Sequence, residues 1–223
     1  MTSARDDVHD LPPLQRLLLA HAPAAARDWQ ALCWHLDQRL AAIARRGGDP
    51  TIAAIRLAWW DAVLVEDDRA KGGGEPLVEQ WRTLAPRGAE AAAERLIDGW
   101  RVLVAPEALS DADLQAYGAA RGGGLFALLA GEAAGAALSA AGSLWALWDL
   151  AAHVRDPALA ARAIDAARRS LPTGATAPLP GRALKSVRLA RAVALPDVRA
   201  ARVPAAGFSP RHYARFLLAA LRG

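Results

Sequence analysis

Asp149 and His153 have the spacing in this sequence that best suits chemistry. They lie four residues apart in the segment 133–154, which is rich in alanine, leucine and tryptophan. A helix would place the carboxylate and the imidazole on one face, one turn apart. Such a pair could bind one metal ion, or it could form a hydrogen-bonded pair in the interior. Of the two interpretations, the hydrogen-bonded pair is favoured.

A second set of candidates lies in the segment 51–64. Its apolar side chains recur about every 3.6 residues and cover most of a helix's circumference, which predicts a helix of the interior. This helix carries one cation, Arg56, and one anion, Asp61, five residues apart and so too far round for an ideal pair. We expect each charge to have a partner from elsewhere in the chain, or to extend to the surface.

Helical patterns also cover the rest of the chain, and no segment alternates with a period of two over a useful length. The fold class predicted is therefore all-α. Proline, glycine and N-cap residues such as Asp49 and Ser110 separate the expected helices. These are a short helix ended by Pro23 and helices at about 24–46, 50–64, 76–84, 89–104, 110–131, 133–154, 156–170 and 209–221. Glycines 122–124 indicate either a break or an element packed very close to the backbone.

Composition limits the classes of protein that remain. With 223 residues, of which 53% are hydrophobic, the chain fits one domain at 11–223 after a tail at 1–10. We expect no secretory signal and no convincing membrane span, which predicts a cytoplasmic protein. The single cysteine, Cys33, excludes an intramolecular disulfide and a thiol-rich metal site. The net charge of +4 is only a weak sign of nucleic-acid binding, and we expect none.

Three motifs occur together in an order that matches a known family. They are the Ala22-Pro23 end of the first helix, the segment from Ile55 through Trp59-Trp60 to Leu64, and Ala141-Gly142 followed by Trp145 and Leu147. The chain resembles the squalene/phytoene synthase family from about residue 12 to residue 169. It is most similar to the divergent alphaproteobacterial branch that also includes the mitochondrial complex I assembly factor of this fold. The resemblance implies a single helical bundle like that of isoprenoid synthases.

Members of that family that condense two isoprenyl diphosphates hold each diphosphate through Mg²⁺, using aspartates one helical turn apart. The resemblance places Ala41, Ala42 and Arg45 at the first aspartate motif, and His153 and Pro157 at the second. None of these five residues is a carboxylate. We therefore expect no cofactor and no head-to-head condensation. Mg²⁺ is expected only if a rearranged acidic set, Asp37, Asp61, Asp98 and Asp149, replaces the two motifs.

Arg45 suggests a different use of the same position, because a guanidinium group can bind an anionic head group without a metal. Arg56, Trp34 and Trp60 are further candidates for substrate binding. The candidates for catalysis are Asp149, His153 and Asp61. Tryptophans at helical spacing are more often part of a core than of a ligand cage.

Three hypotheses remain open at this point. The first is a pseudoenzyme of the family, non-catalytic or altered, that binds an isoprenoid lipid or a protein partner, by resemblance in respiratory complex assembly. The second is an active prenyl transferase of isoprenoid biosynthesis. The third is an adaptor that contacts the inner face of the membrane through the basic segment 182–223. In that segment Arg182, Lys185 and Arg188 would lie close to one side of a helix.

Overall fold

The computed structural model describes residues 11–45, 49–104, 108–131, 135–171, 176–179 and 184–222. Within these ranges the prediction of an all-α protein is confirmed, since the regular elements are helices and no strand is present. In chain order they are α2 (Pro13–Ala20), η2 (Ala24–Ala26), α3 (Arg27–Arg45), α4 (Pro50–Leu64), α5 (Pro76–Leu84), α6 (Glu90–Val102), α7 (Asp111–Tyr117), η3 (Gly118–Gly122), α8 (Gly123–Ala130), α9 (Ala136–His153), α10 (Pro157–Arg169), α11 (Lys185–Arg199) and α12 (Pro210–Arg222).

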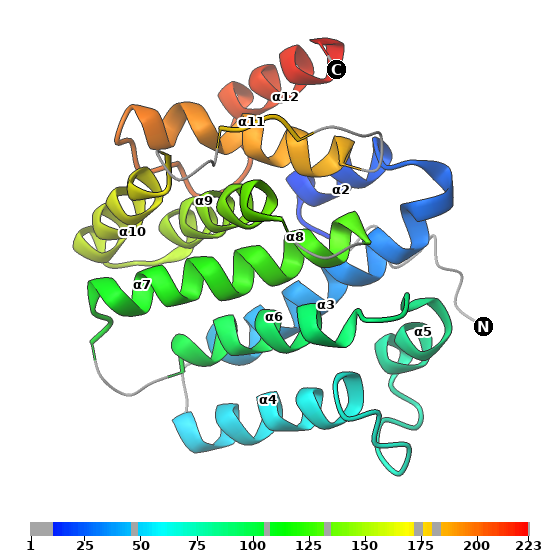
Figure 1. Cartoon of the computed structure of the whole chain (residues 1–223). Coiled ribbons are helices and arrows are strands. Elements are labelled where there is room, and N and C mark those ends of the chain that lie inside the picture. The colour runs from blue at the N-terminus through cyan, green and yellow to red at the C-terminus, as the bar shows by residue number, and fades with distance from the viewer. Residues whose placement is uncertain are drawn as a thin grey trace.

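The helices are stacked around a central rod. Helix α7, the π-helical turn η3 and helix α8 follow one another without a break. The rod is packed against α6 and α3 on one side and against α9 on the other. Helix α9 also contacts α10 and α11, and α12 packs on α11. As Figure 1 shows, α4 lies at one end of this stack and α12 at the opposite end.

Two expected N-caps are present and explain where their helices begin. The Asp49 carboxylate accepts the backbone N–H of Thr51 at 2.8 Å, ahead of the proline that opens α4. Ser110 opens α7 with a capping box, in which its hydroxyl accepts the N–H of Asp113 while the Asp113 carboxylate accepts the N–H of Ser110. Both arrangements satisfy donors that the first helical turn leaves free.

The glycines of the central rod mark close packing rather than a break. A Cβ on Gly122 would lie 2.1 Å from the backbone oxygen of Gly142 on α9, and a Cβ on Gly124 would lie 2.6 Å from backbone atoms of α6. Gly99 on α6 faces the rod in the same way, since its Cβ would lie 2.3 Å from the backbone nitrogen of Arg121. The chain therefore brings three helices into backbone contact around Arg121.

Helix α4 differs from the prediction of a helix of the interior. Its second half is buried at Leu57, Trp60 and Val63, but Ile52 and Ile55 in the first half are 51% and 64% exposed. The apolar pattern runs all round the helix, whereas α6 and α3 cover one side of it. The prediction was wrong for the N-terminal half of α4, because periodicity does not show how many neighbours a helix has at the edge of a bundle.

Candidate functional site

A buried arginine, Arg121, lies at the centre of the bundle and joins α3 to α9. Its Nε and Nη2 donate to the two carboxylate oxygens of Asp37 on α3, at 2.9 and 2.7 Å. Its Nη1 donates to Asp149 on α9 at 2.8 Å and to the Tyr117 hydroxyl at 2.7 Å. The side chains of Arg121 and Asp37 are 0% exposed and that of Asp149 is 7% exposed. We refer to these four residues as the Arg121 cluster.

Aromatic rings close the space around the guanidinium. Its central carbon lies 4.3 Å from the ring centroid of Trp100 and 5.0 Å from that of Trp145, both within range of a cation–π interaction. The Trp100 indole N–H also donates to Asp37 at 2.9 Å. The tryptophans therefore form part of the core, and they exclude water from the Arg121 cluster.

The charges of the Arg121 cluster stabilise one another. Burial raises the pKa of the Asp149 carboxyl, but the nearby Arg121 charge outweighs it, so this pKa lies below its ordinary value. Burial lowers the pKa of Arg121, yet the charge of Asp37 more than compensates and raises it well above the ordinary value. The pKa of Tyr117 is raised, mainly by burial, which keeps its hydroxyl neutral. In this cluster, two buried carboxyl groups therefore share one cation.

These carboxylates do not fit Mg²⁺. The ion needs several carboxylate or water oxygens around it, whereas Arg121 already takes both oxygens of Asp37 and one oxygen of Asp149. A cation of the protein itself thus stands between the two acidic side chains. Across the described ranges, no three side chains of His, Cys, Asp or Glu come together as a metal site would require.

Arg101 binds Asp61 and Asp98, the other two members of the acidic set considered for Mg²⁺. Asp61 on α4 forms an ion pair with Arg101 on α6, and Arg101 also donates to Asp98 one turn before it. The partner of Asp61 therefore comes from another helix, as its position predicts. Arg56, the cation of the same helix, is exposed.

Arg45 and His153 lie together at one end of α3 and α9 and border the same two cavities. One cavity, of about 110 Å³, lies between α2, α3, α9 and the residues before α12, and the other, of about 230 Å³, lies towards α10. The Nδ1 of His153 lies 2.7 Å from the backbone oxygen of Asp149 and 3.6 Å from its carboxylate. The expected hydrogen-bonded pair of buried side chains is therefore not formed, since His153 bonds to the backbone of Asp149 and its side chain is 41% exposed.

The smaller cavity has polar groups on otherwise apolar walls. Leu14, Phe208 and Trp148 are among the apolar residues, and Gln15 and Gln38 supply amides. Gln15 is 4% exposed, and in the described part of the chain its Oε1 has no hydrogen-bond partner. A buried amide without a partner is costly unless a ligand or water completes it. We refer to this space and its lining as the Arg45 site.

The other predicted site residues lie elsewhere. Trp60 and Arg56 line a separate cavity of about 210 Å³, together with the half-buried Ala42. Trp34 is fully buried and packs edge-to-face on Trp145, with 5.3 Å between the ring centroids. Of the positions that the resemblance assigns to the aspartate motifs, Ala41 is buried within α3 and Pro157 is exposed at the start of α10.

The basic stripe of the third hypothesis is partly used within the protein. Arg188 on α11 donates to the backbone oxygen of Leu179 at 3.2 Å, and Arg191 donates to that of Ala177 at 2.6 Å. These arginines hold the segment 176–179 against α11. Arg182 lies outside the described residues.

Comparisons with protein-family models, with curated proteins and with solved structures found no match to this chain. The resemblance to the squalene/phytoene synthase family therefore rests on the sequence motifs alone.

The residue that sequence reasoning missed is Arg121. Two signals point to it: it is the only charged residue between Asp113 and Glu132, and glycines follow it directly. A lone charge in an apolar helix needs a buried partner, and the glycines bring neighbouring helices close enough to supply one.

Proposed function

We propose that this chain is a non-catalytic helical binding protein, related to isoprenoid synthases, whose ligand carries a phosphate or diphosphate group bound at the Arg45 site. One observation carries the non-catalytic part of the proposal. Each carboxylate that a rearranged transferase site would use is bound to an arginine: Asp37 and Asp149 to Arg121, and Asp61 and Asp98 to Arg101.

These ion pairs argue against diphosphate ionisation for an electrostatic reason. A transferase needs carboxylates that are free to hold Mg²⁺ against the leaving diphosphate. To release Asp37 and Asp149, Arg121 would have to leave a dry aromatic pocket and abandon two buried negative charges. The Arg121 cluster therefore supports a structural role for these acids rather than a role in catalysis.

The binding part of the proposal rests on the lining of the Arg45 site. Arg45 offers an exposed guanidinium that can bind phosphate oxygens in a bidentate manner. Gln15 and Gln38 add amide donors, since an amide can turn either its oxygen or its nitrogen to a ligand. At about 110 and 230 Å³, each cavity beside Arg45 is smaller than the roughly 300 Å³ of a typical ligand pocket. A head group fits such a space better than a whole isoprenoid chain.

A protein partner is the second candidate ligand. The exposed Ile52 and Ile55 on α4 favour it, since they leave an apolar face beside the cavity that Trp60 and Arg56 line. The resemblance to the complex I assembly factor would make this partner a respiratory complex subunit.

A binding and turnover experiment tests the proposal. The purified protein is mixed with inorganic pyrophosphate, farnesyl diphosphate or geranylgeranyl diphosphate, with and without Mg²⁺. Pyrophosphate release, lipid products and the melting temperature are then measured. We expect no turnover, but a metal-independent rise in Tm of roughly 5–11 °C at a hundredfold excess of ligand over Kd.

Two variants locate the ligand. Arg45→Gln should abolish the rise in Tm. Arg39→Gln on the same helix should retain it, because Arg39 lines the cavity of Trp60 instead. Mg²⁺-dependent turnover that Asp149→Asn abolishes would overturn the non-catalytic assignment. The absence of any rise in Tm would overturn the phosphate ligand and leave the protein partner.

A further inference from the structure

Helix α12 is apolar on two opposite faces, and only one of them is covered. Its inner face packs on α11 through His212 and Phe216, which are 3% and 0% exposed. The helix lies at the outer end of the stack, beyond α11 (Figure 1). Arg215 also turns inward, to Asp197 on α11, whereas Tyr213, Leu217, Leu218 and Leu221 are exposed.

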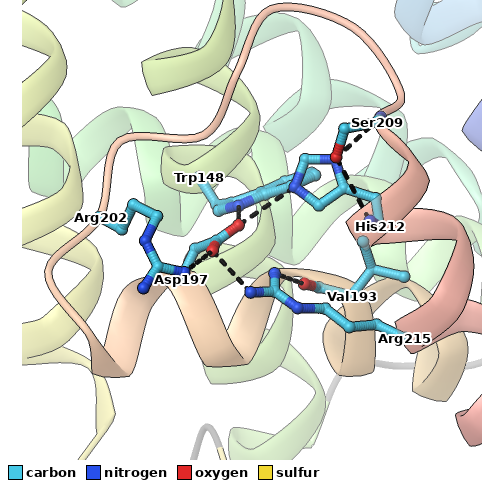
Figure 2. Close-up of polar contacts among 7 residues, drawn as sticks. All are labelled: Trp148, Val193, Asp197, Arg202, Ser209, His212 and Arg215. Carbon is cyan, nitrogen blue, oxygen red and sulfur yellow. Dashed lines mark hydrogen bonds and ion pairs between the residues drawn. The ribbon is translucent and has the colours of Figure 1, made fainter.

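The inner face is fixed by a buried carboxylate, Asp197 on α11, as Figure 2 shows. Asp197 accepts hydrogen bonds from Arg215 at 2.8 Å and from the Trp148 indole at 3.2 Å, and its Oδ2 lies 3.2 Å from Nε2 of His212. Burial raises the pKa of Asp197, but the hydrogen bonds from Arg215, Trp148 and His212 outweigh it and hold this pKa at about 2. These contacts prevent α12 from turning its other face inward.

The outer face is a continuous apolar surface. Tyr213, Leu217 and Leu221 follow at intervals of four residues and so form one stripe, with Leu218 beside it. Tyr213 is 46% exposed, Leu217 42%, Leu218 53% and Leu221 85%. We refer to these four residues as the α12 outer face. Exposed arginines, Arg211 and Arg222, lie at the two ends of the helix, and α12 contains no acidic residue.

The charge of the chain is divided unequally along its length. Residues 166–223 contain 11 arginines and lysines and one acid, Asp197, and so carry +10. Residues 1–165 contain 16 basic and 22 acidic residues and so carry −6. The only acid of this part, Asp197, is buried against α12, and the exposed Arg211 and Arg222 make the surface at both ends of the α12 outer face attractive to anions.

From these observations we propose that the α12 outer face is a membrane-docking surface that inserts into the interface of a bilayer rich in anionic lipid. An interfacial helix needs an apolar face for the acyl boundary and cations beside it for the head groups, and α12 has both. Its 13 residues span about 20 Å, enough to lie along the membrane plane. The proposal is independent of the Arg45 site.

Two other occupants fit the charges less well. A second copy of the chain, packed through the same face, would bring arginines against arginines with no acid on α12 to compensate them. A nucleic acid would satisfy the arginines but would leave Leu217, Leu218 and Leu221 without an apolar partner.

Co-sedimentation with lipid vesicles tests the proposal on the full chain. The vesicles contain phosphatidylcholine alone or with about one third phosphatidylserine. We expect binding to the anionic vesicles, weakened by salt. Leu218→Glu with Leu221→Glu should lower the partition coefficient about tenfold or more, and Arg211→Gln with Arg222→Gln should lower it roughly 10- to 30-fold on anionic vesicles only.

The matched control is Ile52→Glu with Ile55→Glu on α4. These isoleucines are as exposed as Leu218 but lie at the opposite end of the molecule, so binding should be unchanged. Circular dichroism of each variant checks the fold. The proposal is overturned if the wild-type protein does not bind anionic vesicles, or if the leucine variant binds as well as the wild type. A dimer would also overturn the proposal. This outcome requires that light scattering shows a dimer, that the two leucine substitutions dissociate it, and that the wild-type protein does not bind vesicles.

Discussion

Replacing Arg121 with methionine removes the cation that Asp37 and Asp149 share. Methionine keeps most of the apolar volume against the rings of Trp100 and Trp145, so the main change is electrostatic. Asp37 loses both of its contacts to Arg121 and keeps the one from the Trp100 indole. Asp149 loses its contact to Nη1.

The size of the effect follows from burial. The carboxylates are 0% and 7% exposed, and breaking a buried ion pair by removing one partner costs about 3–5 kcal/mol. For a chain of this length each kcal/mol lowers Tm by roughly 2–4 °C, so we expect a decrease of about 6–20 °C at pH 7. Adding Asp37→Asn to Arg121→Met removes one uncompensated charge and should restore part of the lost stability.

The loss of stability should depend on pH in a defined direction. Without Arg121, the burial that raises the pKa of the Asp149 carboxyl is no longer outweighed, so this pKa in the folded variant lies above the unfolded value, near 4. Such groups favour folding below the unfolded pKa, and this stability is lost as pH rises through the folded pKa. The difference between wild type and variant should therefore be largest near pH 7 and should narrow towards pH 4.

Urea unfolding followed by circular dichroism from pH 4 to pH 8 measures this difference. Arg162→Met is the matched control, since Arg162 pairs with Asp111 at 2.8 Å on the surface, where the loss should stay below about 1 kcal/mol. If Arg121→Met cost no more than this control, or cost the same at every pH, the reasoning that two buried carboxyl groups depend on one shared cation would be refuted.

Three further outcomes are expected. Gly122→Ala should destabilise the fold by more than about 2 kcal/mol in urea unfolding, because the added Cβ meets the Gly142 backbone, whereas Gly73→Ala meets nothing within 4 Å and should be neutral. Asp197→Asn should cost about 1–2 kcal/mol at pH 7. Since the folded pKa of Asp197 is about 2, below its unfolded value, that stability is present above pH 4 and is lost as pH falls towards 2, which acid unfolding measures. The Cys33 thiol is buried, and burial raises its pKa, so a disulfide reagent monitored by absorbance should modify it only after unfolding.

Local chemistry made much of the fold predictable. Asp49 and Ser110 begin their helices as N-caps, and a hydrogen bond from Ala158 to the Asp156 carboxylate opens α10. These signals act within one turn and need no tertiary contact. Helix α11 is harder to recognise, since Pro196 lies inside it and proline ordinarily marks a helix end.

The candidate site was less predictable because it depends on which helices become neighbours. Asp37 and Arg121 are separated by 84 residues and meet only because α3 and the central rod pack together. Spacing along one helix shows pairs such as Asp149 and His153, but not a partner from a distant segment. The position of Arg45 near His153 likewise follows from the way α3 and α9 pack on the two sides of the central rod.

The Arg121 cluster and the Arg45 site are linked through the two helices that they share. Arg45 lies about two turns beyond Asp37 on α3, and His153 lies one turn beyond Asp149 on α9, so Arg45 and His153 both lie towards the C-terminal ends of their helices from the cluster. By joining Asp37 to Asp149, Arg121 sets the distance between the helices and hence the width of the space that Arg45 and His153 border. The arginine that pairs with these carboxylates thus also shapes the cavity in which we propose that Arg45 binds an anion.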